Sequence, residues 1–317
     1  MIELLVAYPA LWIGAAAALG LAVGSFINVV THRLPRVWDR DQVDGVAEWA
    51  EVTAAQVVSA FPRAPEGERV VLGEALNTIA RNARTVLAAL PQETLSRPRS
   101  RCPSCGHSIA WWENIPVLSY LVLRGRCSAC HASIGIRYPV VELACGVMAA
   151  LIALKFGASL AGMSALLLFF WLTPLAIIDA ETTWLPNSGT LPLLWAGLIV
   201  NLAGVWTTLP MAVSGAVAGY LFLAVPAWTI ERLRGIPQAM GRGDFALMAA
   251  LGAWFGLASI LPVAVLACVS ALVIALPLLA MGKRDMLSRI PFGPYLALAG
   301  VAYVFFGPNL RALAGLG

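Results

Sequence analysis

Residues 160–181 read LAGMSALLLFFWLTPLAIIDAE, in which 19 residues without a charge are followed at once by Asp179 and then Glu181. About 20 apolar residues are needed for a helix to cross the hydrocarbon core of a bilayer. A helix also satisfies its own backbone hydrogen bonds there, where water is absent. The stretch therefore predicts a membrane-spanning helix with acidic residues at one end.

The rest of the chain repeats this pattern and has the composition of a membrane protein. Of its 317 residues, 60% are hydrophobic and 12% are charged, whereas soluble domains have about 25% charged residues. The mean hydropathy is +0.80. We predict an all-α polytopic membrane protein with about eight transmembrane helices. The predicted spans are 8–31, 139–157, 160–178, 188–205, 208–229, 245–261, 262–281 and 291–310.

The basic residues predict which ends of these helices face the cytoplasm. They fall mainly in residues 33–137, 232–242 and 283–289. With eight spans, these three stretches lie on one side, and the opposite loops near residues 158, 204 and 259 contain no lysine or arginine. Because lysine and arginine accumulate on the cytoplasmic side, we expect both termini on the outer side. The small net charge of +4 gives no reason to expect nucleic acid as a partner.

One long polar segment interrupts the apolar ones. We predict a first transmembrane helix over 1–32, a cytoplasmic domain over 33–138 and a seven-helix membrane domain over 139–317. Within the cytoplasmic domain, 45–60 and 73–90 have the composition of helices, and the proline-containing 61–67 and 91–99 are predicted linkers. The first apolar run is too long for the core of a cleavable signal peptide, so we expect it to be retained.

Four of the six cysteines form two CxxC pairs with 21 residues between them. Two such pairs supply four thiolates to a tetrahedral Zn²⁺ ion, whereas disulfides are rare in the reducing cytoplasm. We predict a structural zinc module over about 100–138. His107 and His131 lie nearby and are interpreted as surface residues rather than ligands. The predicted ligands are Cys102, Cys105, Cys127 and Cys130.

Acidic residues at membrane depth are costly, so they are candidates for function. Asp179 follows the third predicted span, and Asp244 precedes the sixth within the sequence GRGD; both lie on the predicted cytoplasmic side. If these helices pack together, the two carboxyls meet and share one proton. One would activate a water and the other would donate to the oxygen of a scissile carbonyl. The sequence does not show which residue has which role.

Other interpretations of these acids are open at this stage. An acid at the end of a span is often a solvated charge or a helix cap, and Asp244 could be an N-cap. Glu181 is interpreted as a solvated neighbour of the pair or as a residue that tunes it. The aspartates could also be proton or cation sites of a transporter or channel, although that function does not explain the cysteine module.

Further stretches give the chain a close resemblance to the type IV prepilin peptidases, intramembrane aspartic proteases of the Gly-x-Gly-Asp type. Residues 24–35, GSFINVVTHRLP, resemble the family's first-span signature. Residues 100–103 (SRCP), 112–120 (WENIPVLSY) and 124–127 (RGRC) resemble its zinc module, and 137–142 continue the match. The family's catalytic aspartates lie in an Asp-six residues-Pro motif and in the Gly-x-Gly-Asp motif, which here end at Pro186 and Asp244.

The resemblance implies a bifunctional enzyme of the bacterial inner membrane, with Asp179 and Asp244 as catalytic residues. Such enzymes cleave the leader peptide of type IV prepilins and secretion pseudopilins at the cytoplasmic membrane face. They then methylate the new N-terminus with S-adenosyl-L-methionine. Both termini would be periplasmic, the active site and zinc module cytoplasmic, and the partners would be these substrates and membrane lipid. No glycine-rich fingerprint for the methyl donor is present, so the zinc module and the loop at Glu113 and Asn114 are the candidates for supporting it.

Three departures from the family pattern are visible. Asn187 stands where many members have aspartate, Ala246 replaces a lysine after the Gly-x-Gly-Asp-Phe stretch, and the polar segment 37–98 is longer than usual. Two alternatives to the bifunctional enzyme remain besides a transporter: a peptidase without methyl transfer, and an assembly scaffold with an inactive aspartate pair.

Overall fold

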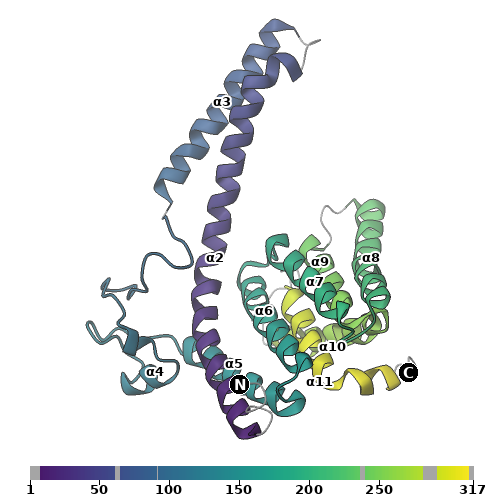
Figure 1. Ribbon diagram of the computed structural model, residues 1–317. Helices are drawn as coiled ribbons and strands as arrows, with labels where there is room; N and C mark the ends of the chain where they lie inside the picture. The colour runs from purple at the N-terminus through teal and green to yellow at the C-terminus, as the bar shows by residue number, and fades with distance from the viewer. Residues whose placement is uncertain (1–7, 61–64, 91, 236–239, 281–290, 314–317) are drawn as a thin grey trace. The chain divides into compact units, whose positions relative to one another are not determined.

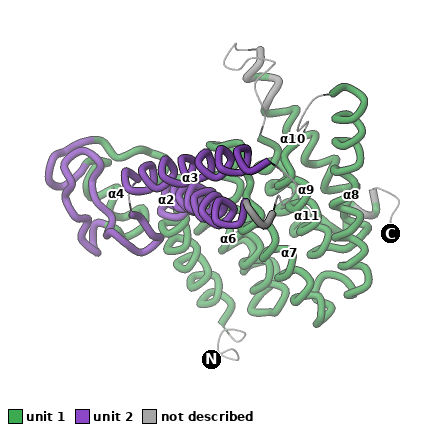
Figure 2. Tube along the Cα trace, turned by 90° about the horizontal axis from the view of Figure 1, so that it is seen from above, with its two compact units in different colours: residues 1–28, 114–126, 133–317 green, residues 29–113, 127–132 purple. Residues whose placement is uncertain are grey.

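The computed structural model describes residues 8–60, 65–90, 92–235, 240–280 and 291–313. Across these ranges the regular elements are helices, with two isolated β-bridges near the cysteine pairs, as the predicted all-α fold requires. The chain forms two compact units, coloured separately in Figure 2: unit 1 contains residues 1–28, 114–126 and 133–317, and unit 2 contains residues 29–113 and 127–132.

Each of the eight predicted spans has a helix at its position (Figure 1). Five stretches in the described part of the chain are long and apolar enough to cross a membrane: Pro9–Val57, Arg137–Phe156, Leu160–Thr182, Leu209–Arg234 and Leu257–Ile274. The helices are α2 (Pro9–Ala60), α5 (Arg137–Phe156), α6 (Leu160–Thr182), α7 (Asn187–Leu202), α8 (Leu209–Arg234), α9 (Arg242–Phe255), α10 (Ile260–Ala280) and α11 (Gly293–Leu313).

The helix α9 is the centre of unit 1. It packs against α7, α8 and α11, and every residue from Gly243 to Phe255 is buried. A helix that is apolar on all sides belongs in the interior of a bundle. On α8, Gly215 lets the backbones approach closely, because a Cβ added to Gly252 would lie 2.1 Å from the carbonyl oxygen of Gly215. The bundle therefore holds the first turn of α9 in a fixed place.

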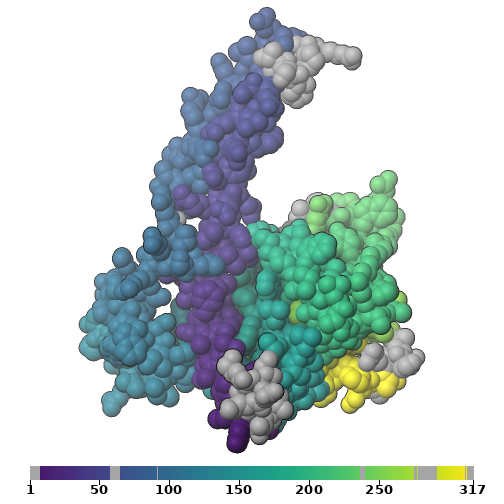
Figure 3. All heavy atoms as spheres, viewed as in Figure 1, coloured from purple at the N-terminus to yellow at the C-terminus, as the bar shows by residue number. Residues whose placement is uncertain are grey.

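The outer face of α7 has the opposite character. Beyond its first turn, large apolar residues are exposed at helical spacing on one side, as expected for a surface in contact with lipid. This helix lies on the teal-to-green face of unit 1 in Figure 3. The exposed side chains are Leu191, Trp195, Ile199 and Leu202.

The first helix is much longer than its predicted span of 8–31. Helix α2 continues through Pro35 to Ala60 and includes the segment 45–60 that was predicted as a separate helix. Pro35 removes one backbone donor, but this loss does not end the helix. In unit 2, the end of α2 runs beside α3 (Glu66–Ala89) in both views (Figures 1 and 2). Most of the predicted linker 61–67 lies outside the described residues.

The boundary between the sixth and seventh predicted spans was also placed wrongly. Helix α9 ends at Phe255 rather than at residue 261, because Gly256 has φ +82° and breaks the helical backbone. A short 3₁₀ turn over Leu257–Ser259 follows, and α10 begins at Ile260. Pro262 lies in the first turn of α10, where a missing backbone donor is tolerated.

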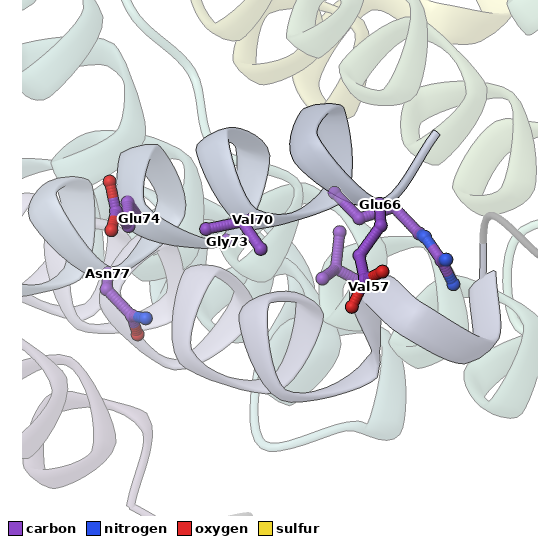
Figure 4. Close-up of a pocket in the computed structure, with 7 residues that line it drawn as sticks. Val57, Glu66, Val70, Gly73, Glu74 and Asn77 are labelled. Atoms are coloured by element: carbon purple, nitrogen blue, oxygen red, sulfur yellow. The ribbon is translucent and has the colours of Figure 1, made fainter. Parts of the chain in front are cut away.

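A recess of about 290 Å³ lies between α2 and α3 in unit 2. In Figure 4, Glu74 and Asn77 are at one end of it and Glu66 is at the other. Its lining contains no residue that the sequence marks for catalysis or metal binding. The lining residues are Val57, Glu66, Arg69, Val70, Gly73, Glu74 and Asn77.

Candidate functional site

Asp179 lies in the last turn of α6, where it is 4% exposed. The helix ends just beyond it, because Thr183 has a left-handed backbone (φ 53°) and donates its N–H to the carbonyl oxygen of Asp179 at 2.8 Å. Pro186 then precedes the first residue of α7. The sequence between Asp179 and Pro186 thus forms a tight connection between two packed helices.

Asp244 lies in the first turn of α9, where it is 8% exposed. The residue before it, Gly243, is pressed against this α6–α7 connection, since an added Cβ would lie 2.1 Å from the carbonyl oxygen of Leu185. Any larger residue would push α9 away. The second glycine of the GRGD sequence is therefore explained by the approach of α9 to the segment that follows Asp179.

The turn that carries Asp244 contacts the segment that follows Asp179, which places the two carboxyls close enough for one charge to affect the other. A third helix completes their surroundings. The backbone N–H of Gly293, the first residue of α11, donates to Oδ2 of Asp179 at 2.9 Å in a buried hydrogen bond. Oδ1 of Asp244 is buried and has no hydrogen-bond partner among the described residues. The pair is therefore asymmetric.

The N-cap interpretation of Asp244 does not hold. The N-cap of α9 is Gly241, and no side chain caps this end of the helix. Asp244 lies inside the first turn, where a helix N-terminus favours negative charge. Its carboxyl is thus left available for chemistry.

The neighbouring residues occupy different positions. Glu181 forms an ion pair with Arg137 at the start of α5, and both side chains are about half exposed, so Glu181 lies apart from the buried pair. Asn187 is exposed as the first residue of α7. Ala246 is 5% exposed within α9, so the lysine found there in the family pattern would have to fit into a packed interior.

The four predicted cysteine ligands come together in unit 2. Their Sγ atoms all lie within 4.8 Å of one another, and those of Cys102 and Cys130 are 3.8 Å apart. Zinc–sulfur bonds of about 2.3 Å in a tetrahedron place the sulfurs about 3.8 Å apart, so the cluster fits such an ion. The backbone N–H groups of Cys105 and Ser104 lower the pKa of Cys102 to about 6, which favours the thiolate that binds metal.

The two CxxC turns are built alike. The N–H of Cys102 donates to the carbonyl oxygen of His107, and the N–H of Cys127 donates to that of Ala132, each at 2.9 Å. A residue with positive φ follows each turn, Gly106 in one and His131 in the other. This repetition of local structure was not predicted from the sequence.

Glu113 supports this module from inside. Its carboxylate accepts a hydrogen bond from the N–H of Ala110 at 2.7 Å and contacts Nε2 of His107 at 3.2 Å. His107 also lies 3.4 Å from the hydroxyl of Ser128. Neither histidine belongs to the described cluster of possible metal ligands. The contacts of Glu113 indicate a structural role within the module.

Sequence models of two families match this chain. The model of the bacterial peptidase A24 N-terminal domain matches residues 18–156, and that of the type IV leader peptidase family matches residues 166–276. The second match contains both aspartates.

Relatives named prepilin leader peptidase/N-methyltransferase are similar over nearly their full length. The chain is 44% identical to one from Burkholderia pseudomallei (strain K96243) over 95% of this chain and 87% of the relative. It is 40% identical to one from Stutzerimonas stutzeri and 37% identical to one from Pseudomonas aeruginosa, each over 98% of this chain and 96% of the relative. No solved structure matches the chain.

Proposed function

The chain belongs to the type IV leader peptidase family, and from this premise we propose that it cleaves the leader peptides of prepilins and pseudopilins and methylates the new N-termini. Its near full-length similarity to enzymes named for both activities supports the pairing. The single observation that carries the peptidase activity is the buried, interacting pair of Asp179 and Asp244 at adjoining helix ends.

The asymmetry of the pair supports separate roles in hydrolysis. Asp179 accepts the N–H of Gly293, and a hydrogen bond to a carboxylate favours its charged form. Among the described residues, Oδ1 of Asp244 is buried without a hydrogen-bond partner, which suits the member that carries the shared proton. Asp179 would take a proton from a water while that water attacks the scissile carbonyl carbon, and Asp244 would donate to the carbonyl oxygen. When the carbon–nitrogen bond breaks, Asp179 would pass the proton taken from the water to the leaving nitrogen, which becomes the new amino terminus. Asp244 would regain its proton from the hydroxyl of the tetrahedral intermediate as the carboxyl product forms.

The second reaction would act on that amino terminus. S-adenosyl-L-methionine would supply the methyl group from its sulfonium, and S-adenosylhomocysteine and a proton from the amino group would be the other products. This activity rests on the names of the relatives, and no described residue is assigned to the donor. Glu113 is an unsuitable contact for it, because its carboxylate is already engaged by Ala110 and His107.

We assign zinc to the four cysteines, in a structural role. Four thiolates would occupy all four positions of a tetrahedral zinc ion and leave none for a reactive water. Bound zinc would therefore stabilise the fold of the small module. Burial and the hydrogen bond with Cys130 outweigh the effect of the His107 backbone and raise the pKa of Cys105 to about 12. A cation among the sulfurs would allow all four to be thiolates, which supports this assignment.

The membrane arrangement is part of the proposal. The eight helices at the predicted spans, α2 and α5 to α11, would cross the membrane, with α7 and α9 as the shortest spans. Both termini would be periplasmic and residues 33–138 cytoplasmic, in a bacterial inner membrane, because the basic stretches lie on one side. The basic stretch 283–289 is outside the described residues, so it supports this only through its sequence.

Incubation of the purified protein with a prepilin and a methyl-labelled donor tests both activities. We expect a shortened pilin that carries the label. A shortened but unlabelled product would show a peptidase alone, and an uncut prepilin would favour the scaffold or transporter alternatives. The same assay with a pilin that has already been cut separates methyl transfer from cleavage.

A further inference from the structure

The short helix α4 (Leu118–Val122) shows its apolar side to the surroundings. Leu118, Leu121 and Val122 lie on one face at positions i, i+3 and i+4, and they are 55%, 65% and 69% exposed. In a water-soluble domain this face would be turned inward. The exposed face belongs to a segment between the cysteine pairs, outside every predicted span.

The other side of α4 is held by hydrogen bonds and packing. The N–H of Val117 donates to Oε2 of Glu142 in α5 at 2.8 Å, and the N–H of Ile134 donates to the carbonyl oxygen of Gly125 at 2.7 Å. Gly125 also lies against the ring of Tyr120. The segment 114–126 is thus tied to α5 near one end and to Ile134, just before α5, near the other, so the outward direction of the apolar face is fixed.

A second exposed apolar face runs along α5, the helix to which this segment is tied through Glu142. Exposed apolar residues recur along that helix with spacings of three and four, in line with Ile136 just before it. At the same end, Arg137 pairs with Glu181 of α6, two residues beyond Asp179. This places α4 at the membrane face where the aspartates lie. The exposed α5 residues are Val140, Leu143, Val147, Leu151 and Leu154.

The charges around α4 suit an anionic surface. No aspartate or glutamate occurs from residue 114 to residue 141, and Arg124 and Arg126 are exposed directly after the helix. Basic residues beside an apolar helical face are typical of segments that lie in the headgroup region of an anionic leaflet.

We propose that α4 is an interfacial anchor that inserts Leu118, Leu121 and Val122 into the lipid leaflet beside α5, with Arg124 and Arg126 at anionic headgroups. The anchor would fix the segment between the two cysteine pairs against the membrane at the level of the aspartates. This inference is independent of the proposed enzymatic function, because it rests on exposure, tethering and charge alone.

Photo-crosslinking to lipid tests the proposal on the full-length protein in nanodiscs. Benzoyl-phenylalanine would replace Leu121, and the mass of the intact protein would show lipid adducts after illumination. Leu154 on α5 is the positive control and Val71 on α3 is the negative control, since both are as exposed as Leu121 (67% and 66% against 65%). We expect adduct yields at Leu121 and Leu154 that are similar and several-fold above the yield at Val71.

A yield at Leu121 no higher than at Val71 would overturn the proposal. So would a crosslink from Leu121 to an added prepilin in place of lipid, because the face would then bind substrate. In a second arm, phosphatidylglycerol in phosphatidylcholine nanodiscs should raise the yield at Leu121, and the Arg124→Gln/Arg126→Gln variant should lose most of that increase. An unchanged increase would contradict the role of the arginines. The zinc content of each variant reports whether the module has folded.

Discussion

At the scale of single residues, the two aspartates have the same side chain in different surroundings. Asp179 is held by a backbone donor from another helix, and Asp244 is not held by any hydrogen bond to its buried Oδ1 in the described chain. A pair of identical carboxyls in identical surroundings would have no preferred location for its proton. The hydrogen bond from Gly293 to Asp179 makes the surroundings of the two carboxyls different. We therefore expect a change at Gly293 to affect cleavage.

We predict that Gly293→Ala lowers the kcat of leader cleavage by about 10²-fold, the effect of a displacement of about 1 Å in a catalytic group. An added Cβ would lie 2.7 Å from Oδ2 and 3.0 Å from Cγ of Asp179, so the carboxyl must move. KM and the methylation of a pre-cut pilin should change little. Gly300→Ala on the same helix is the matched control, because its Cβ would meet the ends of the Leu251 and Leu172 side chains and not a catalytic group. Equal losses of kcat in the two variants would contradict the positioning role.

Asn201 illustrates a buried polar residue with a structural role. It is 1% exposed, and its amide donates to the carbonyl oxygens of Ala253 and Trp254, each at 2.8 Å. Its oxygen accepts the N–H groups of Trp206 and Thr207 at 3.0 and 3.2 Å. The side chain thus connects the ends of α7 and α9.

We predict that Asn201→Ala lowers the free energy of unfolding by about 2 kcal/mol or more, because it leaves buried backbone groups unpaired. Thermal unfolding in detergent would measure this change. The exposed Asn187 on the same helix provides the control, and Asn187→Ala should change stability by less than about 0.5 kcal/mol. Similar stabilities of the two variants would show that the connection contributes little.

The aspartates and cysteines were predictable from sequence because each has a motif around it, whereas Gly293 was not. Its contribution is a backbone N–H, which every residue except proline has. Only the packing of α11 against α6 makes that donor meet Asp179, 114 positions earlier in the chain. A search for chemically distinctive side chains does not find such a residue.

At the scale of elements, apolar runs located the helices but not all of their ends. Runs of about 20 residues are fixed by the thickness of the bilayer, so they are visible in sequence. The end of α9 depends on the backbone of Gly256, and the length of α2 depends on a polar helix that continues past Pro35. Neither the end of α9 nor the continuation of α2 is marked in the sequence by the start or end of an apolar run. The matching folds of the two CxxC turns were likewise hidden, since their backbone hydrogen bonds leave no mark in the side chains.

The module that these turns form should depend on its metal. We predict that a chelator, or the variant Cys102→Ser, unfolds residues 100–113 and 127–132 locally while the membrane helices remain folded. Limited proteolysis would show new cleavage in these residues, and circular dichroism would show little loss of helix. Cys268→Ser, outside the cluster, should retain the metal. A module that resists protease after metal removal would refute the structural role of zinc.

At the scale of the whole molecule, the side of the membrane on which each helix end lies decides where the aspartates meet a substrate. The loops near residues 158, 204 and 259 carry no lysine or arginine, and the basic loops alternate with them. Charge bias of this kind predicts orientation because lysine and arginine are retained on the cytoplasmic side. The orientation that we propose for both units rests on this charge bias alone.

We predict that alkaline phosphatase, which is active only outside the cytoplasm, is active when fused after residue 158, 204 or 259. It should be inactive after residue 100 or 234. Activity after residue 100 would place the cysteine module outside, and two active fusions on neighbouring loops would show that a helix between them does not cross.

We propose that Asp179 and Asp244 act together as the catalytic pair. The decisive measurement is the rate of prepilin cleavage by three variants: Asp179→Asn, Asp244→Asn and the double variant. We expect each single variant to lose about 10³-fold or more in cleavage, and the double variant to lose no more than the worse single one, because groups that act as a unit are not additive. Methylation of a pre-cut pilin should persist in all three, as proof that they fold. Cleavage near the wild-type rate in either single variant would contradict the account.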